Sequence, residues 1–323
     1  DYLFRFLEAY DFSSEGGEQI QEENKTLINA SVLGLIFEKI NGYKDGSFFT
    51  PGFITMYMCN ETIRRAVLQK FRDHTEYDSE DWSELKNYIG KPYRKADLQK
   101  YNELIDGIKI CDPAVGSGHF LVSALNEIIA VKSDLNILSS VDYDKLPVIA
   151  VVDNDELIIQ NDNEENDLYE YDYTHAQSRI IQKALFDQKQ KIIENCLFGV
   201  DINPNSVKIC RLRLWIELLK NAYYTEESSY TDLETLPNID INIKCGNSLI
   251  SRFDLDSDLK PALKKSKFTI DSYKAAVASY KQATDKADKL EFKSLIEGIK
   301  SDFRSEVHGK EIKDLQKMEG QFY

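Results

Sequence analysis

The stretch GIKICDPAVGSG (107–118), followed by HFLVSALNEIIAVKSDL (119–135), decides how this chain folds. Residues 107–111 form a short apolar run that predicts a buried strand. Two glycines, at 116 and 118, then permit a tight turn and a close approach of a ligand to the backbone. The next segment has apolar residues at helical spacing and predicts an amphipathic helix. Strand, glycine loop and helix together indicate an α/β fold with a ligand site at the strand end.

Two later segments repeat the pattern of an apolar strand followed by a polar loop. Residues 197–200 (LFGV) end in Asp201, and residues 239–245 (IDINIKC) alternate as a strand and end before Gly246. In a doubly wound sheet the carboxyl ends of the strands share one edge, where ligands bind. We therefore expect Asp112, Asp201 and Gly246 to lie close together despite their separation in the sequence.

The remaining patterns divide the chain into three predicted domains. Residues 1–105 predict an N-terminal helical region in which Thr50 is the N-cap of a helix and Pro51 its first residue. Residues 106–257 predict the α/β core. Residues 258–323, rich in Lys, Glu, Ala and Leu, predict a helical hairpin.

Residues 133–195 interrupt the α/β pattern of the core. Two apolar runs flank residues 153–155 (DND) and predict a β-hairpin with its turn at Asn154. The acidic stretch that follows, 161–173, is interpreted as a solvated surface loop. A helix over 174–196 then leads back to the second core strand.

The residues of the first two loops indicate what kind of ligand they would hold. The loop 112–118 lacks the third glycine of the dinucleotide fingerprint. Its first residue, Asp112, would repel a pyrophosphate but suits a ligand with an ammonium or sulfonium group. Asp201 alone could be a helix N-cap or an acceptor of ribose hydroxyls. Paired with the glycine loop, it favours the ribose role, with residues 133–195 as an insertion between the two.

Four segments in this order resemble amino-group DNA methyltransferases, and above all the Eco57I-like adenine-specific group of bacterial restriction–modification systems. They are GSFFTP (46–51), DPAVGSGHFL (112–121), LFGVDINPNSVKICRLRLWIELL (197–219) and IKCGNSLI (243–250). The resemblance covers about residues 28–255. It implies a Rossmann-like class I fold that uses S-adenosyl-L-methionine to methylate adenine N6 in double-stranded DNA.

The resemblance also implies a role for each matching residue. The residues implied to hold the methionine end of the cofactor or to line its pocket are Phe49 (tyrosine in the family), Thr50, Asp112, Ala114, Gly116 and Gly118. Asp201 would accept the ribose hydroxyls, with Ile202 packed on the adenine ring. Asn247 stands where the family often has aspartate and would contact the adenine amino group, flanked by Ser248 and Leu249.

The N/D/S-P-P-aromatic tetrapeptide that such enzymes need for catalysis is absent from the sequence. Its polar atoms accept the hydrogens of the adenine amine, and its aromatic residue stacks on the flipped base. The nearest match, NPNS (203–206), lacks the second proline and the aromatic residue. In the family this loop follows a helical insertion like 258–323. We therefore expect the chain to be a fragment that binds cofactor at most and lacks turnover.

The composition fits a soluble, cytoplasmic globular protein, with 42% hydrophobic residues and no apolar run long enough for a membrane span. The net charge of −15 argues against a DNA-binding surface, because such surfaces neutralise phosphates. Contacts with DNA, and an associated restriction endonuclease domain or subunit, should therefore lie outside this chain.

The five cysteines form no C-x-x-C pair and are interpreted as reduced core thiols. They make no metal-ligand spacing with the four histidines, so no metal is expected.

Two other functions fit parts of the sequence. An NAD(P)-dependent oxidoreductase would share the glycine loop and the ribose carboxylate, but the missing third glycine and Asp112 oppose it. A non-catalytic helical interaction module would rest on residues 258–323. Basic residues on the helix after Asp201, including Arg211 and Arg213, are interpreted as part of an ordinary solvated face.

Overall fold

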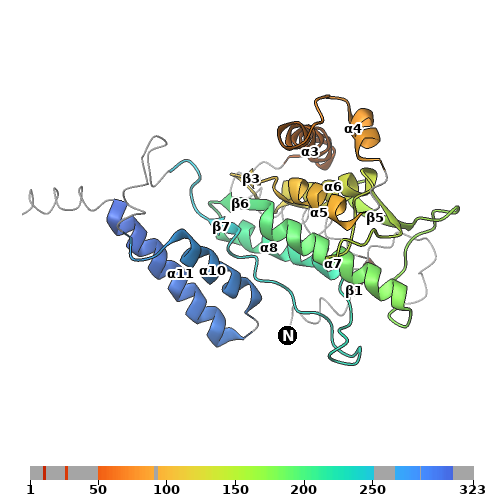
Figure 1. Ribbon diagram of the computed structural model, residues 1–323. Helices are drawn as coiled ribbons and strands as arrows, with labels where there is room; N and C mark the ends of the chain where they lie inside the picture. The colour runs from red at the N-terminus through yellow and green to blue at the C-terminus, as the bar shows by residue number, and fades with distance from the viewer. Residues whose placement is uncertain are drawn as a thin grey trace, which may run out of the picture. The chain divides into compact units, whose positions relative to one another are not determined.

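The computed structural model describes residues 10–11, 26–27, 50–90, 94–250, 266–283 and 285–307 (Figure 1). The chain divides into two compact units, residues 1–248 and 249–323. The first unit contains the sheets and the helices around them, and the described part of the second contains a pair of helices. The domain boundaries predicted from the sequence stay predictions.

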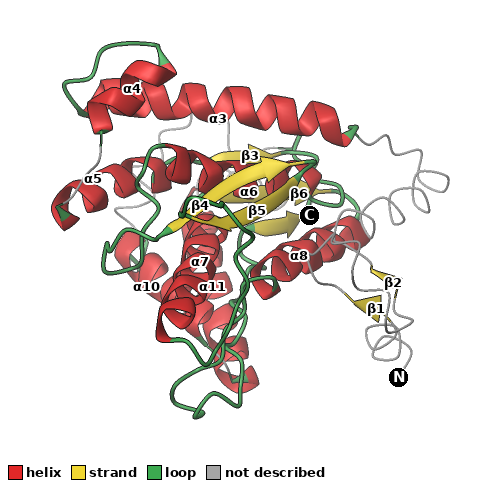
Figure 2. Ribbon diagram, turned by 90° about the vertical axis from the view of Figure 1, so that its right-hand side faces the viewer, coloured by secondary structure: helices red, strands yellow, loops and turns green. Residues whose placement is uncertain are grey.

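Three strands of the first unit form a parallel sheet in the order β3-β6-β7 (Figure 1), and Figure 2 shows β3 and β6 of this sheet from another side. They are β3 Ile110–Asp112, β6 Leu197–Asp201 and β7 Ile243–Cys245. Asp112 pairs with Gly199, and Asp201 pairs with Cys245. Because the strands are parallel, all three end at the same edge of the sheet, as the sequence predicts.

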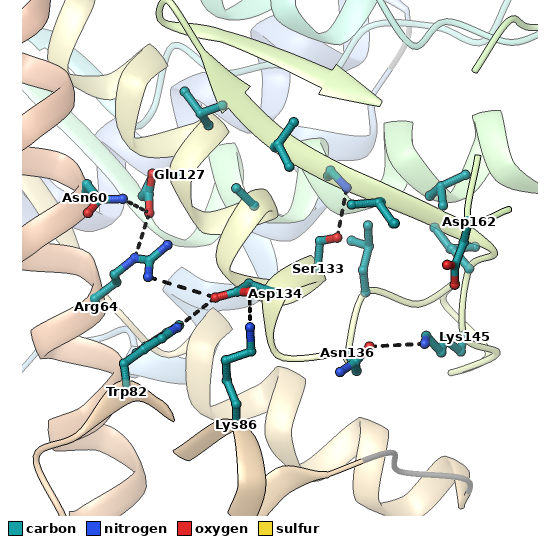
Figure 3. A pocket seen from close by; sticks show the side chains of 18 of the residues that line it. Asn60, Arg64, Trp82, Lys86, Glu127, Ser133, Asp134, Asn136, Lys145 and Asp162 are labelled. Atoms are coloured by element: carbon teal, nitrogen blue, oxygen red, sulfur yellow. Dashed lines mark hydrogen bonds and ion pairs between the residues drawn. The ribbon is translucent and has the colours of Figure 1, made fainter. Parts of the chain in front are cut away.

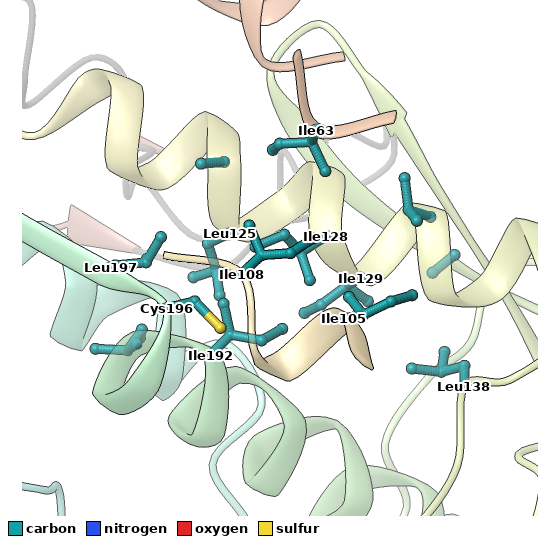
Figure 4. Packing of buried hydrophobic residues seen from close by; sticks show 14 of the residues in the cluster. Ile63, Ile105, Ile108, Leu125, Ile128, Ile129, Leu138, Ile192, Cys196 and Leu197 are labelled. Atoms are coloured by element: carbon teal, nitrogen blue, oxygen red, sulfur yellow. The ribbon is translucent and has the colours of Figure 1, made fainter. Parts of the chain in front are cut away.

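Helix α6, His119–Asp134, is the central element of the first unit. It contacts α3 (Gly52–His74), the β4–β5 hairpin, α7 (Ala176–Asn195) and α8 (Pro204–Leu219). Every residue from 121 to 129 is buried. The expectation of an amphipathic helix is therefore wrong: neighbours enclose α6 on all sides, as is usual for a helix without a solvent face. Figure 4 shows part of this core, where α6 packs beside α5 (Lys95–Asp106) and α7.

The inserted hairpin consists of β4, Val148–Asp153, and β5, Glu156–Asn161, paired antiparallel. The two turn residues, Asn154 and Asp155, have φ values of 47° and 69°. Positive φ at both central residues is the signature of a type I′ hairpin turn, for which Asn and Asp are suited. The predicted hairpin with its turn at Asn154 is confirmed.

Helix α3 begins one residue later than expected. Its cap residue is Pro51, whose ψ of 142° is extended, and whose carbonyl accepts from the N–H groups of Ile54 and Thr55. The expectation that Thr50 caps the helix and that Pro51 is its first residue is therefore wrong. After α3, the short α4, Trp82–Ile89, is capped by Asp81, which accepts from the N–H of Glu84 at 2.9 Å.

Residues 239–242 form a turn, although the sequence predicts that β7 starts there. The N–H of Asn242 donates to the carbonyl of Ile239 at 3.2 Å. The Asn242 side chain is buried and donates to the carbonyls of Ile193 and Leu197 at 2.9 and 3.0 Å. This side chain joins the end of α7 to the start of β6. The backbone carbonyl of Asn242 accepts from the N–H of Gly199 on β6 at 3.0 Å, so the turn leads directly into the pairing of β7.

The second unit contains α10, Ile270–Gln282, and α11, Lys286–Val307, which contact each other. The helical hairpin expected from the sequence is present, and the first helix among its described residues begins at 270. Thr269 ends the preceding loop and caps α10, because its hydroxyl accepts from the N–H of Ser272 at 3.0 Å. Residues 251–265 lie outside the described residues.

Three further features differ from expectation or were not predicted. Tyr10–Asp11 (β1) and Thr26–Leu27 (β2) form a parallel pair within the region predicted as helical. Cys111 and Cys245 are exposed at the ends of β3 and β7, so these two are not core thiols. No helix among the described residues is long and apolar enough to cross a membrane.

Candidate functional site

The glycine loop joins β3 to α6 through two left-handed residues. Gly116 and Gly118 have φ values of 54° and 87°. A Cβ atom at Gly118 would lie 2.6 Å from the Sγ of Cys210 on α8. Gly118 therefore allows both the left-handed turn and the close packing of the loop on α8.

Asp201 joins the three loops that the sequence predicts to meet. Its Oδ2 accepts from the N–H of Gly116 at 2.8 Å, and its Oδ1 accepts from the N–H of Asn203 at 2.7 Å. Its backbone carbonyl accepts from the N–H of Gly246 at 2.9 Å. The structure thus connects the glycine loop, the end of β6 and the loop after β7 through one residue.

Asp112 makes the edge of the sheet electrically negative. Burial raises the pKa of its carboxyl above the usual range, the N–H of Ala114 at 3.0 Å opposes this, and the nearby charge of Asp201 raises the pKa further. Two carboxylates that repel each other would be stabilised by a cation and destabilised further by an anion. The two carboxylates, Asp112 and Asp201, therefore fit a positively charged ligand.

Arg213 supports the glycine loop from behind, which the sequence reasoning missed. Its side chain is 1% exposed, and its guanidinium donates to the Oγ of Ser117 at 3.1 Å. The neighbouring Arg211 donates to the carbonyls of Asp240 and Ile243 at 3.2 and 2.5 Å. The interpretation of these two arginines as a solvated face is wrong, because the loop and β7 lie against α8.

The other predicted site residues lie at or near the surface. Ile202, next to Asp201, is 72% exposed, and Asn247 and Ser248 are exposed on the loop after β7. Leu249 is exposed and is the first residue of the second unit. Thr50 is exposed just before α3.

One predicted residue, Phe49, lies outside the described residues. The structure therefore brings together Asp112, Ala114, Gly116, Gly118 and Asp201. Ile202 follows Asp201 in the sequence, and Asn247 follows Gly246, whose N–H donates to the carbonyl of Asp201. The predicted ligand contacts of all these residues stay predictions.

A cleft of about 700 Å³ lies elsewhere in the first unit (Figure 3). It is lined by α3, α4, the second half of α6 and β4, and none of the predicted site residues lines it. Arg64 lies over the ring of Trp82 there and contacts Glu127 at 3.5 Å. The Oγ of Ser133 accepts from the N–H of Ala150 on β4 at 2.8 Å.

A parallel sheet whose strand ends gather a glycine loop and two carboxylates defines an α/β domain, and in such sheets this edge is where ligands usually bind. Comparison with known families makes this more specific. Residues 88–303 match the model of the DNA-methyltransferase domain of MmeI, and the chain belongs to this family of restriction–modification methyltransferases. Residues 1–28 match a domain of unknown function.

Two relatives combine restriction and methylation in their names. A Methanocaldococcus jannaschii protein named as a type II restriction enzyme and methyltransferase, RM.MjaORFECS2P, is 30% identical over 269 residues, which are 78% of this chain and 19% of that protein. The Escherichia coli type II restriction enzyme and methyltransferase RM.Eco57I is 30% identical over 161 residues, 50% of this chain and 12% of that protein. The chain thus spans a fifth or less of the length of these relatives.

Proposed function

We propose that this chain is the cofactor-binding part of a site-specific DNA adenine-N6 methyltransferase that uses S-adenosyl-L-methionine. The observation that carries the proposal is the junction at Asp201, which accepts from Gly116 and holds Gly246. This junction joins the glycine loop, the carboxylate of Asp201 and the loop of Asn247 at one sheet edge. In the proposal this carboxylate accepts the ribose hydroxyls. The family supports DNA methylation as the reaction.

The residues at this edge have the chemistry that the cofactor requires. S-adenosyl-L-methionine supplies an activated methyl group on a sulfonium, and it carries a second positive charge on its ammonium. Asp112, with Asp201 nearby, favours positive charge on the bound ligand. Each carboxylate oxygen of Asp201 can accept a bond from a ribose hydroxyl besides its backbone N–H. Ile202 offers an exposed apolar side chain for the adenine ring.

The strand order supports a class I methyltransferase sheet. In doubly wound folds the order 3-2-1-4 places the strand with the glycine loop at the point where the order reverses. Here β7, β6 and β3 correspond to strands 3, 2 and 1 of that order. A fourth strand would pair with the outer edge of β3, which has no partner among the described strands.

Asn203 does not provide the missing catalytic loop. Its Oδ1 accepts from the N–H of Asn205 at 2.9 Å, and Pro204 follows as the first residue of α8. This segment is a helix cap, and the tetrapeptide that would orient the adenine amine is not in the sequence. We propose that the chain alone lacks turnover. Contacts to DNA and any endonuclease activity would belong to other parts of the enzyme.

Calorimetry with S-adenosylmethionine and S-adenosylhomocysteine tests the proposal. We expect one ligand per chain, and at least tenfold weaker binding after Asp201→Ala, which removes the ribose acceptor. Asp78→Ala, at an exposed position between α3 and α4, is the matched control and should bind as the wild type does. We expect no methylation of DNA by the isolated chain.

Three outcomes would contradict the proposal. Absence of binding at millimolar ligand would reject the cofactor site. NADH binding, detected by its fluorescence, without binding of either adenosyl ligand would favour an oxidoreductase. Methylation of DNA by the isolated chain would reject the statement that it lacks turnover.

A further inference from the structure

His119, the residue directly after Gly118, lies between the glycine loop and two distant segments. Its Nε2 lies 2.6 Å from the Oδ2 of Asp155 in the turn of the β4–β5 hairpin. Its Cε1 lies 3.0 Å from the position that a Cβ at Gly52 would occupy, so the ring packs against the first residue of α3. Neither neighbour is close to His119 in the sequence.

Asp155 is held on several sides. It is 7% exposed, its Oδ1 accepts from the Oγ of Ser123 at 2.5 Å, and its carbonyl accepts from the amide of Asn126 at 3.0 Å. A buried carboxylate is costly unless such donors satisfy it. The first turn of α6, where His119 lies, is also where the helix dipole favours negative charge.

The same cluster extends to the start of α3. The Oγ of Ser123 lies 3.5 Å from the Oγ1 of Thr55, a buried residue. The hydroxyl of Thr55 donates to the carbonyl of Gly52 at 2.7 Å. Asp155 therefore reaches the backbone at Gly52 through the ring of His119. It also holds Ser123, whose hydroxyl oxygen packs against that of Thr55.

We infer that Asp155 is a positioning residue of the cofactor site. Through His119, Ser123 and Thr55 it fixes the start of α3, and with it Thr50, relative to the glycine loop. The inserted hairpin would then set the affinity for the amino-acid end of the cofactor. This inference rests on the proposed function, because it assumes that Thr50 binds the methionine carboxylate.

Two turn variants and two ligands test the inference. Asp155→Gly removes the carboxylate and keeps a residue suited to positive φ, and Asn154→Gly makes the same change at the neighbouring turn position. S-adenosylhomocysteine contains the amino-acid part, and 5′-deoxy-5′-methylthioadenosine lacks it. We expect Asp155→Gly to weaken binding of the first ligand about tenfold or more, a cost of about 1.4 kcal/mol per tenfold. Binding of the second should change less than threefold.

The controls separate positioning from general damage. Asn154→Gly should bind both ligands as the wild type does, and Asp155→Asn, whose amide oxygen still accepts one bond, should lose less affinity than Asp155→Gly. If Asp155→Gly shows no cooperative thermal unfolding, Ser123→Ala takes its place with the same expected selectivity. Equal losses for the two ligands, or no loss, would overturn the inference. A wild-type chain that binds neither ligand would instead overturn the proposed function, and the inference with it.

Discussion

Position 118 imposes two constraints that only glycine satisfies: a left-handed backbone and no space for a Cβ atom. Its φ of 87° lies in the left-handed region, and its α-carbon packs against Cys210 without room for a side chain. Both constraints arise because the loop must turn sharply and still lie flat on α8. The position is therefore important for stability even without a ligand.

Gly118→Ala should lower the free energy of unfolding by about 2–5 kcal/mol. About 1–2 kcal/mol comes from the left-handed backbone and about 1–3 from the forced shift of Cys210. Urea denaturation followed by circular dichroism measures the change. Gly246→Ala is the control, because its Cβ would lie 3.9 Å from Val200, an ordinary contact. A similar small effect of both variants would contradict the close approach at Gly118.

Asp112→Asn should stabilise the ligand-free protein at pH 7 and weaken binding of S-adenosylmethionine. Burial raises the pKa of Asp112, so the charged form is disfavoured in the folded state. Wild-type stability should therefore rise as pH falls through this raised pKa toward the unfolded value, whereas asparagine does not titrate. Thermal unfolding at pH 7 and pH 4 should show a gap between the two proteins that narrows at pH 4. A gap that widens on acidification would contradict the assignment.

Helices α5, α6 and α7 are joined by a buried cation. Lys132 is 0% exposed, and its Nζ donates to Asp106 at 2.5 Å and to Gln188 at 2.7 Å. Burial lowers the pKa of Lys132, and the charge of Asp106 opposes that shift. Asp106 has a second partner, Lys191 at 2.8 Å, which is partly exposed.

The two ends of this ion pair should respond unequally to mutation. Asp106→Ala leaves Lys132 buried without a carboxylate and should cost about 3–5 kcal/mol. Lys132→Met removes the buried charge while Asp106 keeps Lys191, so it should cost clearly less. Urea denaturation of both variants checks the order. The reverse order would show that Lys191 does not compensate Asp106.

At the scale of elements, the sequence predicts what depends on local periodicity and turn chemistry. The hairpin follows from alternating apolar residues around Asn154, and a helix follows Asp201 as expected. The cap of that helix is Asn203, which the sequence reasoning did not single out. The extent of β7 was not predictable in the same way, because residues 239–242 turn and the Asn242 side chain bonds the carbonyl of Ile193 at the end of α7. Alternation does not reveal such a partner.

At the scale of the whole molecule, the meeting of the three loops was predictable because parallel strands end at one edge. What holds the loops in place was not. Arg213 was interpreted as a surface cation, but it is buried and donates to Ser117. Asp155 is a turn residue of the hairpin, and its carboxylate also contacts His119. Both are contacts between segments far apart in the sequence, and no residue pattern near either one specifies them.

The outer edge of β3 has a consequence for how the protein could be used. Among the described strands, β3 pairs only with β6, so its other edge has no partner strand there. If the proposed function holds, a second polypeptide that carries the next strand and its N-P-P-aromatic loop could complete the sheet in trans. Such a split enzyme would methylate DNA only where its two halves meet, and would report their proximity as a heritable mark on the genome.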